Sequence, residues 1–182
     1  MKAESAILFE PSARGLNSKS LLTFVNSACR AAGLRGSVSI LISNNLRLRE
    51  LNFRHRARNA ATDVLSFPTG ERHNGFAGDI VISRDIAAAN AHALGHSLSE
   101  EIRILILHGI LHLAGYDHEK DHGEMEQKEA ALRKKMGLPT GLIQRTLESA
   151  KSAGGNWSSA KLRSSSNSQR PRTNNNQRRK TT

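Results

Sequence analysis

The chain contains a single cysteine, Cys29, among its 182 residues. One cysteine cannot form an intramolecular disulfide, and it excludes a metal cluster built from several thiolates. Such scarcity is usual in proteins of a reducing compartment. We therefore assign Cys29 to the hydrophobic core.

Long apolar runs are also missing. No stretch approaches the ~20 consecutive apolar residues of a membrane span. The N-terminus has no apolar run of signal-peptide length, and it includes Glu4 and Glu10, whereas transit peptides are poor in acidic residues. These absences predict a soluble cytoplasmic protein without a membrane partner, or one inside an organelle if an import signal of another kind is present.

Acidic residues are absent after Glu148. The whole chain has 27 Lys and Arg against 16 Asp and Glu, and this net charge of +11 indicates a polyanionic partner such as nucleic acid. Eight of the excess charges lie after Glu148, so the preceding part is only +3. The last stretch is rich in Ser, Asn, Gln, Lys and Arg and has no apolar periodicity, so it buries too little surface to offset its ordering entropy. We predict a folded domain at residues 1–148 and a disordered basic tail, which could also hold RNA, at residues 149–182.

Apolar patterning predicts an α+β fold. Strands are expected at residues 6–10, 37–43, 62–68 and 78–83. Helices are expected from a cap at Ser18 or Ser20 to Gly33, around residues 46–53, at 84–94, from Ser99 to Gly115, and from a capping pair of Asp121 and Glu124 to Gly137. This order predicts a single compact domain with a small mixed four-stranded sheet packed with about five helices, and not a doubly wound fold.

The most informative stretch is HGILHLAGYDH at residues 108–118. His108 and His112 are one helical turn apart and project from the same face of a helix that is apolar on nearly every side. Gly115 can end this helix in the left-handed conformation, so that His118 approaches the other two imidazoles. Three neutral imidazoles, with a fourth position left to water, form the arrangement of a catalytic zinc site. We predict one Zn²⁺ per chain on His108, His112 and His118, at the end of the central buried helix.

Two other interpretations of this stretch are less favoured. The spacing also occurs in the metzincin proteases, HExxHxxGxxH, but these need a glutamate as general base where this chain has Gly109. Ordinary helix histidines are improbable because an unpartnered imidazole in an apolar helix is costly. Glu101, seven residues before His108, and Asp117 are candidate acceptors for the second ring nitrogens of the ligands.

Other polar residues are assigned structural roles. His92 and His96 repeat the one-turn spacing, but Gly95 between them is expected to end the helix, so we predict no second metal site there. Asp63 and Asp79 open predicted strands, where aspartate commonly bonds nearby backbone N–H groups. Ser66 and Ser83 have no histidine and aspartate around them in a nucleophilic arrangement.

The stretch HGILHLAGYDH resembles the signature of the YbeY family, HGxLHLxGYDH, at every fixed position. LNFRHRARNAATDVLSFP, AGDIVIS and MEQKEAALRKKMGLP resemble further motifs of that family, in the same order. The resemblance covers residues 37–139, and the first 36 residues are only compatible with it. It implies a zinc-dependent endoribonuclease, specific for single strands, that acts in maturation of the 3′ end of small-subunit (16S) rRNA and in ribosome quality control. The implied partners are ribosomal RNA, the pre-ribosomal small subunit and a small-subunit ribosomal protein, without a small-molecule cofactor.

The resemblance also implies a catalytic role for Arg56. This residue lies in LRLRELNFRHRAR, a basic cluster suited to phosphates. The other arginines of the cluster are interpreted singly as a solvated helix surface: Arg47, Arg49, Arg54 and Arg58. Two alternatives to the nuclease stay open. One is a non-catalytic RNA-binding factor of ribosome maturation with a structural zinc, and the other is a different metal-dependent hydrolase.

Overall fold

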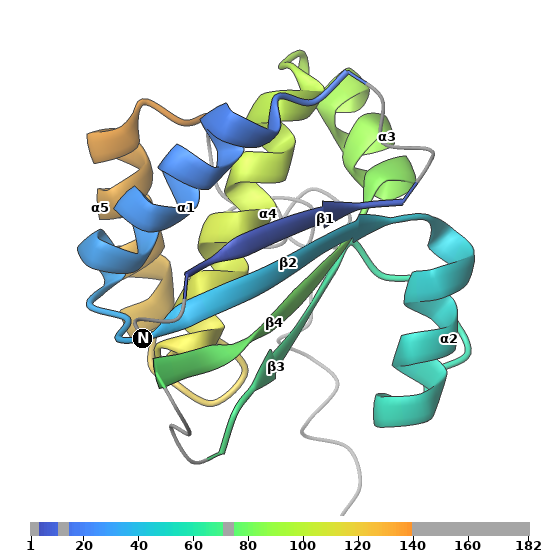
Figure 1. The fold of residues 1–182 in the computed structure, drawn as a ribbon, viewed down its shortest axis with the longest axis horizontal. Helices are drawn as coiled ribbons and strands as arrows, with labels where there is room; N and C mark the ends of the chain where they lie inside the picture. Colours follow the sequence, from blue (N-terminus) through green and yellow to red (C-terminus); the bar gives the residue numbers. More distant parts are fainter. Residues whose placement is uncertain (1–3, 11–14, 71–74, 140–182) are drawn as a thin grey trace, which may run out of the picture.

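A mixed sheet of four strands forms the centre of the protein, in a computed structural model that describes residues 4–10, 15–70 and 75–139 (Figure 1). The strands are β1 (Ala6–Phe9), β2 (Ser37–Ser43), β3 (Val64–Pro68) and β4 (Phe76–Ser83). Their order is β1-β2-β4-β3, with β1, β2 and β4 parallel and β3 antiparallel to β4 at one edge. All four predicted strands are confirmed, with ends that differ by two residues at most.

Five helices accompany the sheet in the described residues: α1 (Ser18–Ala32), α2 (Asn45–Arg56), α3 (Arg84–Leu94), α4 (Leu98–Leu113) and α5 (Glu124–Met136). Figure 1 shows α1, α4 and α5 together on one side of the sheet and α2 apart from them. The predicted α+β architecture with a mixed four-stranded sheet and five helices is therefore confirmed.

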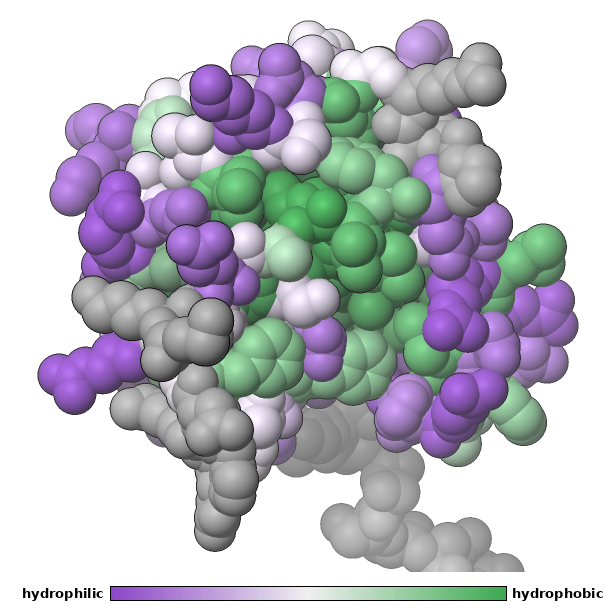
Figure 2. Space-filling view, viewed as in Figure 1, coloured by the Kyte–Doolittle hydropathy of each residue, from purple (hydrophilic) through white to green (hydrophobic). Residues whose placement is uncertain are grey.

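Both faces of the sheet bury apolar side chains. Along β2, Ile40 and Ile42 are fully buried in the main core, whereas Leu41 between them belongs to a second cluster. The second cluster also contains side chains from α2, β3 and β4: Leu48, Leu51, Leu65, Phe67 and Val81. Figure 2, seen from the same direction as Figure 1, shows apolar side chains gathered over the strands. Helix α2 therefore covers only part of this face.

Helix α4 is deeply buried, as its apolar sequence predicts, because 11 of its 16 residues belong to the interior. It begins at Leu98, and its N-cap lies two residues before the expected start at Ser99. Ser97 is the N-cap, and its Oγ accepts from the Glu100 amide while the Glu100 carboxylate accepts from the Ser97 amide. This reciprocal capping box satisfies two amides that a helix start leaves without intrahelical partners. The predicted start at Ser99 is therefore wrong.

Two other predicted helix starts also need correction. Asn17, rather than Ser18 or Ser20, caps α1, because its side chain accepts from the Ser20 amide at 2.9 Å. Helix α5 has Gly123 at its N-cap position, with no side-chain cap. Asp121 nevertheless accepts from the Met125 amide at 2.9 Å, so it stabilises the first turn from outside the helix.

The far end of the chain lies outside the described residues. The predicted boundary at residue 148 and the predicted disordered tail at residues 149–182 therefore stay predictions. Within the part that the structure describes, none of the helices combines the length and apolar character needed to cross a membrane.

Candidate metal centre

The three histidines of the motif converge at the C-terminal end of α4. His108 and His112 project from the last two turns of the helix, and Gly115, with φ of 99°, turns the chain so that His118 comes back toward them. The imidazole centroids lie 4.7, 5.3 and 5.4 Å apart, and one nitrogen of each ring lies within 4.8 Å of the others. The convergence predicted from the spacing is therefore present.

Hydrogen bonds set the orientation of two of these rings. The Nδ1 of His108 lies 2.9 Å from a carboxylate oxygen of Glu129, and the Nδ1 of His112 lies 3.1 Å from the backbone oxygen of Tyr116. A carboxylate and a carbonyl only accept hydrogen bonds, so each Nδ1 carries the proton and donates it. Each Nε2 is left with an unprotonated lone pair.

The two Nε2 atoms lie 3.1 Å apart. Two lone pairs at this separation repel each other unless a cation lies between them. Imidazole nitrogens bound to one tetrahedral zinc at ~2.0 Å lie about 3.3 Å apart. The donor set therefore fits a metal ion on His108, His112 and His118.

Burial changes steadily across the site. His108 is buried, His112 is half-buried and His118 is exposed. Burial, followed by the neighbouring imidazoles of His108 and His118, lowers the pKa of His112 to about 4. His112 is therefore neutral at pH 7, as a metal ligand must be, and the exposed side leaves room for water or substrate.

The site opens into a cleft of about 660 Å³. Its walls come from the end of α2, from β3 and the residues before it, and from the turn after α4. The lining residues used below are Arg56, Arg58, Asp63, Ser66, Asp117 and the three histidines. The cleft therefore combines cations with the metal ligands.

The five arginines of the basic cluster differ in their contacts, and Nε of Arg49 donates to the side-chain oxygen of Asn59 at 2.7 Å. Arg47 and Arg54 contact Glu50 at 2.9 and 2.8 Å. Arg56 and Arg58 line the cleft. Arg58 is exposed, in agreement with its interpretation as a solvated residue, but it lies beyond the end of α2 and on the cleft wall rather than on a helix surface.

Gly109 contributes to the site through its lack of a side chain. A Cβ at this position would lie 2.9 Å from Cγ2 of Ile80 and 3.1 Å from Oγ of Ser66. Helix α4 therefore packs directly on β3 and β4 here, which holds the metal histidines against the sheet. The glutamate that a metzincin needs would not fit.

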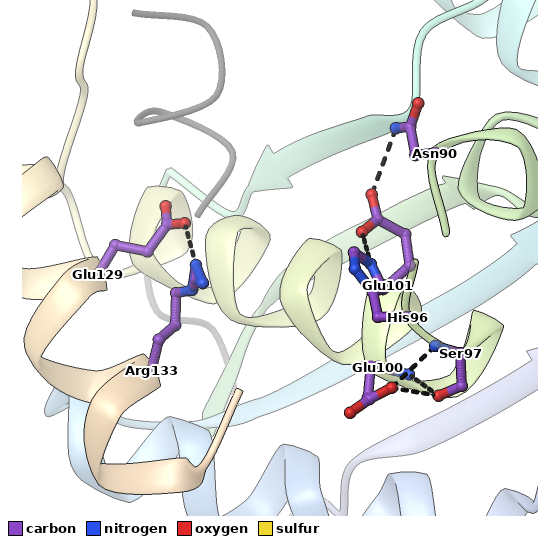
Figure 3. Close-up of polar contacts among 7 residues, drawn as sticks. All are labelled: Asn90, His96, Ser97, Glu100, Glu101, Glu129 and Arg133. Carbon is purple, nitrogen blue, oxygen red and sulfur yellow. Dashed lines mark hydrogen bonds and ion pairs between the residues drawn. The ribbon is translucent and has the colours of Figure 1, made fainter. Parts of the chain in front are cut away.

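Glu101 does not orient a metal ligand, contrary to the sequence-based suggestion. Its carboxylate lies 2.7 Å from Nε2 of His96 and 3.3 Å from the side-chain nitrogen of Asn90 (Figure 3). His96 is thus a packing residue, as predicted, and Gly95 ends α3 before it with φ of 71°. Exposed His92 lies on α3.

The aspartates have local roles. Asp63, which lines the cleft, accepts from the Val64 amide and the Thr62 hydroxyl, at 2.8 and 3.1 Å. Asp117 contacts Lys120 at 2.7 Å, and this hydrogen bond lowers the pKa of the Asp117 carboxyl. Asp79 is exposed in β4 and does not line the cleft.

Ser83 has a structural role, because it caps α3 with its Oγ accepting from the Ile86 amide at 3.2 Å.

Glu129 is the residue of the site that sequence reasoning missed. It follows Met125 by four residues and precedes Leu132 by three, so it shares the apolar face expected for the last helix. A carboxylate on such a face needs a partner. The position of Glu129 on the apolar face of the last helix was therefore the one feature of the sequence that could have indicated its role.

Three imidazoles on the wall of an open cleft that also carries arginines, in a small α+β domain, define a candidate metal-dependent enzyme. The family model described as "Endoribonuclease YbeY" matches residues 12–137, and the chain belongs to the YbeY family. The match begins at residue 12, so it extends the resemblance beyond the motifs, which start at residue 37. The membership predicted from the motifs is confirmed.

Individual relatives agree with this assignment. The "Endoribonuclease YbeY" of Koribacter versatilis is 53% identical over 147 residues, which cover 81% of this chain and 95% of the relative. Its counterpart from Aquifex aeolicus is 42% identical over 130 residues, covering 70% and 86%. The solution structure of TM1509 from Thermotoga maritima has a TM-score of 0.50 and 25% identity, covering 84% of this chain and 97% of that one.

Proposed function

We propose that this protein is a single-strand-specific endoribonuclease that acts in maturation of the 3′ end of small-subunit (16S) rRNA and in ribosome quality control. The proposed metal is one zinc ion on His108, His112 and His118. The observation that carries this proposal is the convergence of three oriented imidazoles in an open cleft. The relatives named "Endoribonuclease YbeY" support RNA as the substrate.

The residues of the cleft suit phosphodiester cleavage. When bound, the metal supplies Lewis-acid polarisation of a phosphoryl oxygen and lowers the pKa of a water molecule. Arg56 binds the non-bridging oxygens of the scissile phosphate and stabilises the charge that develops there. Arg58, on the same wall, holds a neighbouring phosphate through a charge-assisted hydrogen bond.

The open form of the site favours catalysis over a purely structural metal. A structural zinc is usually enclosed by four protein ligands. Here one ligand, His118, is exposed, and the three imidazoles lie in a cleft of about 660 Å³. The proposed partners are ribosomal RNA, the pre-ribosomal small subunit and a small-subunit ribosomal protein, in the cytoplasm.

The test compares wild type with three variants for zinc content and for cleavage of a structured rRNA fragment that has a single-stranded 3′ extension. His112→Ala should lose both zinc and cleavage. Arg56→Ala should retain zinc but cleave about 10²–10³-fold more slowly, the usual effect of removing one group that stabilises transition-state charge. Arg54→Ala is the matched control, because Arg54 contacts Glu50 on the same helix, and it should retain both properties.

Three results would contradict parts of the proposal. Zinc-loaded wild type that binds the fragment without cutting it would indicate a non-catalytic maturation factor. Cleavage by zinc-free His112→Ala would exclude metal-dependent chemistry. Full activity of Arg56→Ala would remove the role assigned to this arginine.

A further inference from the structure

Two glutamates are buried against histidines, one near each end of α4. Glu129, on α5, is 2% exposed and lies 2.9 Å from Nδ1 of His108. Glu101, on α4 itself, is fully buried and lies 2.7 Å from Nε2 of His96. His108 belongs to the candidate metal centre, whereas His96 does not. Figure 3 shows Glu129 and Glu101 at opposite ends of the helix.

Glu129 determines which nitrogen of His108 faces the other two histidines. Its carboxylate accepts the proton of Nδ1, which leaves Nε2 as a lone-pair donor 3.1 Å from Nε2 of His112. A carboxylate behind a ligand also raises the basicity of the imidazole. The backbone oxygen of Tyr116 fixes the tautomer of His112 but carries no net charge.

The position of Glu129 is itself fixed by the packing of α5. Arg133, one turn later and 3% exposed, places Nη1 3.6 Å from the Glu129 carboxylate (Figure 3). Met125 and Leu132, on the same face of α5, are buried in the main core. Helix α5 therefore presents a carboxylate to α4 at one defined place.

We propose that Glu129 is a positioning residue of the metal centre, which fixes the tautomer and orientation of His108 and strengthens metal binding. This inference rests on the proposed function in one respect, namely that a metal ion binds His108, His112 and His118. It adds α5 to the elements that build the site.

The experiment measures the dissociation constant of Co²⁺ and its visible absorption spectrum in the full-length protein. Glu129→Gln retains the shape and removes the charge, and it should weaken Co²⁺ binding about 10–100-fold and shift the absorption bands. Glu101→Gln is the matched control, since it changes an equally buried glutamate beside a histidine outside the site. It should bind Co²⁺ as wild type does, even where it loses thermal stability.

Two further measurements keep the test decisive. Glu129→Gln combined with Arg133→Met removes the buried cation that the single substitution would leave without its carboxylate, and it should show the same loss of affinity. ¹⁵N NMR of metal-free wild type reports the tautomer of His108 without any substitution, and we expect the proton on Nδ1.

The outcomes separate this inference from the proposed function. Unchanged Co²⁺ affinity in the Glu129 variants, or a proton on Nε2 of His108, would overturn the role of Glu129 and leave the nuclease proposal standing. Wild type that binds neither Co²⁺ nor Zn²⁺ would overturn both.

Discussion

The arginines at the end of α2 differ in what each side chain contacts. Arg47 and Arg54 share the carboxylate of Glu50, which offsets part of their charge. Arg56 and Arg58 flank Ala57, which has φ of 55°, a conformation that costs a non-glycine residue about 1–2 kcal/mol. This turn ends the helix and leaves both flanking arginines on the wall of the cleft. Two positive charges therefore lie together on this part of the wall, and Asp63, Asp117 and Glu119 line the same cleft.

At the scale of single residues, Cys29 also predicts how the stability of the protein depends on pH. Burial raises the pKa of its thiol from 9.0 to about 11. Because the folded pKa exceeds the unfolded one, the thiol contributes stability below pH 9 that is lost as pH rises from 9 to 11. Urea unfolding measures the effect. Between pH 8 and pH 11, the free energy of unfolding of wild type should fall by about 1–3 kcal/mol more than that of Cys29→Ala.

The alanine variant is the control in that comparison, because every other titrating group is common to both proteins. The native thiol should also resist iodoacetamide at pH 8 and react once urea unfolds the chain, since the thiolate is the nucleophile. Parallel pH profiles for the two proteins would contradict the assignment of Cys29 to a site that disfavours its charge.

At the scale of elements, the contact of α4 with the sheet depends on Gly109. We expect Gly109→Ala to lower the free energy of unfolding by about 1–2 kcal/mol, because overpacking costs about 1–3 kcal/mol and better helix propensity returns up to ~1 kcal/mol. The new Cβ would press on Ile80, which is fully buried. Thermal or urea unfolding measures the effect.

The control for this prediction is Gly70→Ala. A Cβ at Gly70 would have no atom within 4 Å outside its own residue and its two chain neighbours, and its φ does not lie in the left-handed region. Gly70→Ala should therefore have nearly the same free energy of unfolding as wild type. Equal stability of Gly109→Ala and wild type would mean that α4 does not need its close approach to β4.

The elements were largely predictable because their signals are local. Apolar alternation and caps lie within a few residues of each strand or helix, and the three ligands lie within 11 residues of sequence. Contacts between distant elements were not predictable in this way. Glu101 was suggested because it shares a helix face with His108, but seven residues span about 10 Å along a helix, which is too far for direct contact. Glu129 meets His108 only because α5 packs on α4.

At the scale of the whole molecule, charge is divided unevenly along the chain. Residues 1–148 have a net charge of +3, and the remaining residues add +8 with no acidic side chain. Within the described residues, two arginines lie on the wall of the cleft that holds the metal ligands. Specific cleavage and general attraction to RNA should therefore be separable properties of the protein.

Truncation after residue 148 tests this separation. Binding of single-stranded RNA should become weaker at low salt and less dependent on salt. The slope of log K against log salt concentration should flatten by up to about 6, if all eight cations of residues 149–182 contact phosphates. Fluorescence anisotropy over a series of KCl concentrations measures the slope. Cleavage at saturating RNA should not change, because Arg56 and the three histidines are retained. A full-length variant with these eight cations replaced by glutamine should behave like the truncated protein, whereas an unchanged slope in both would show that the segment does not bind RNA.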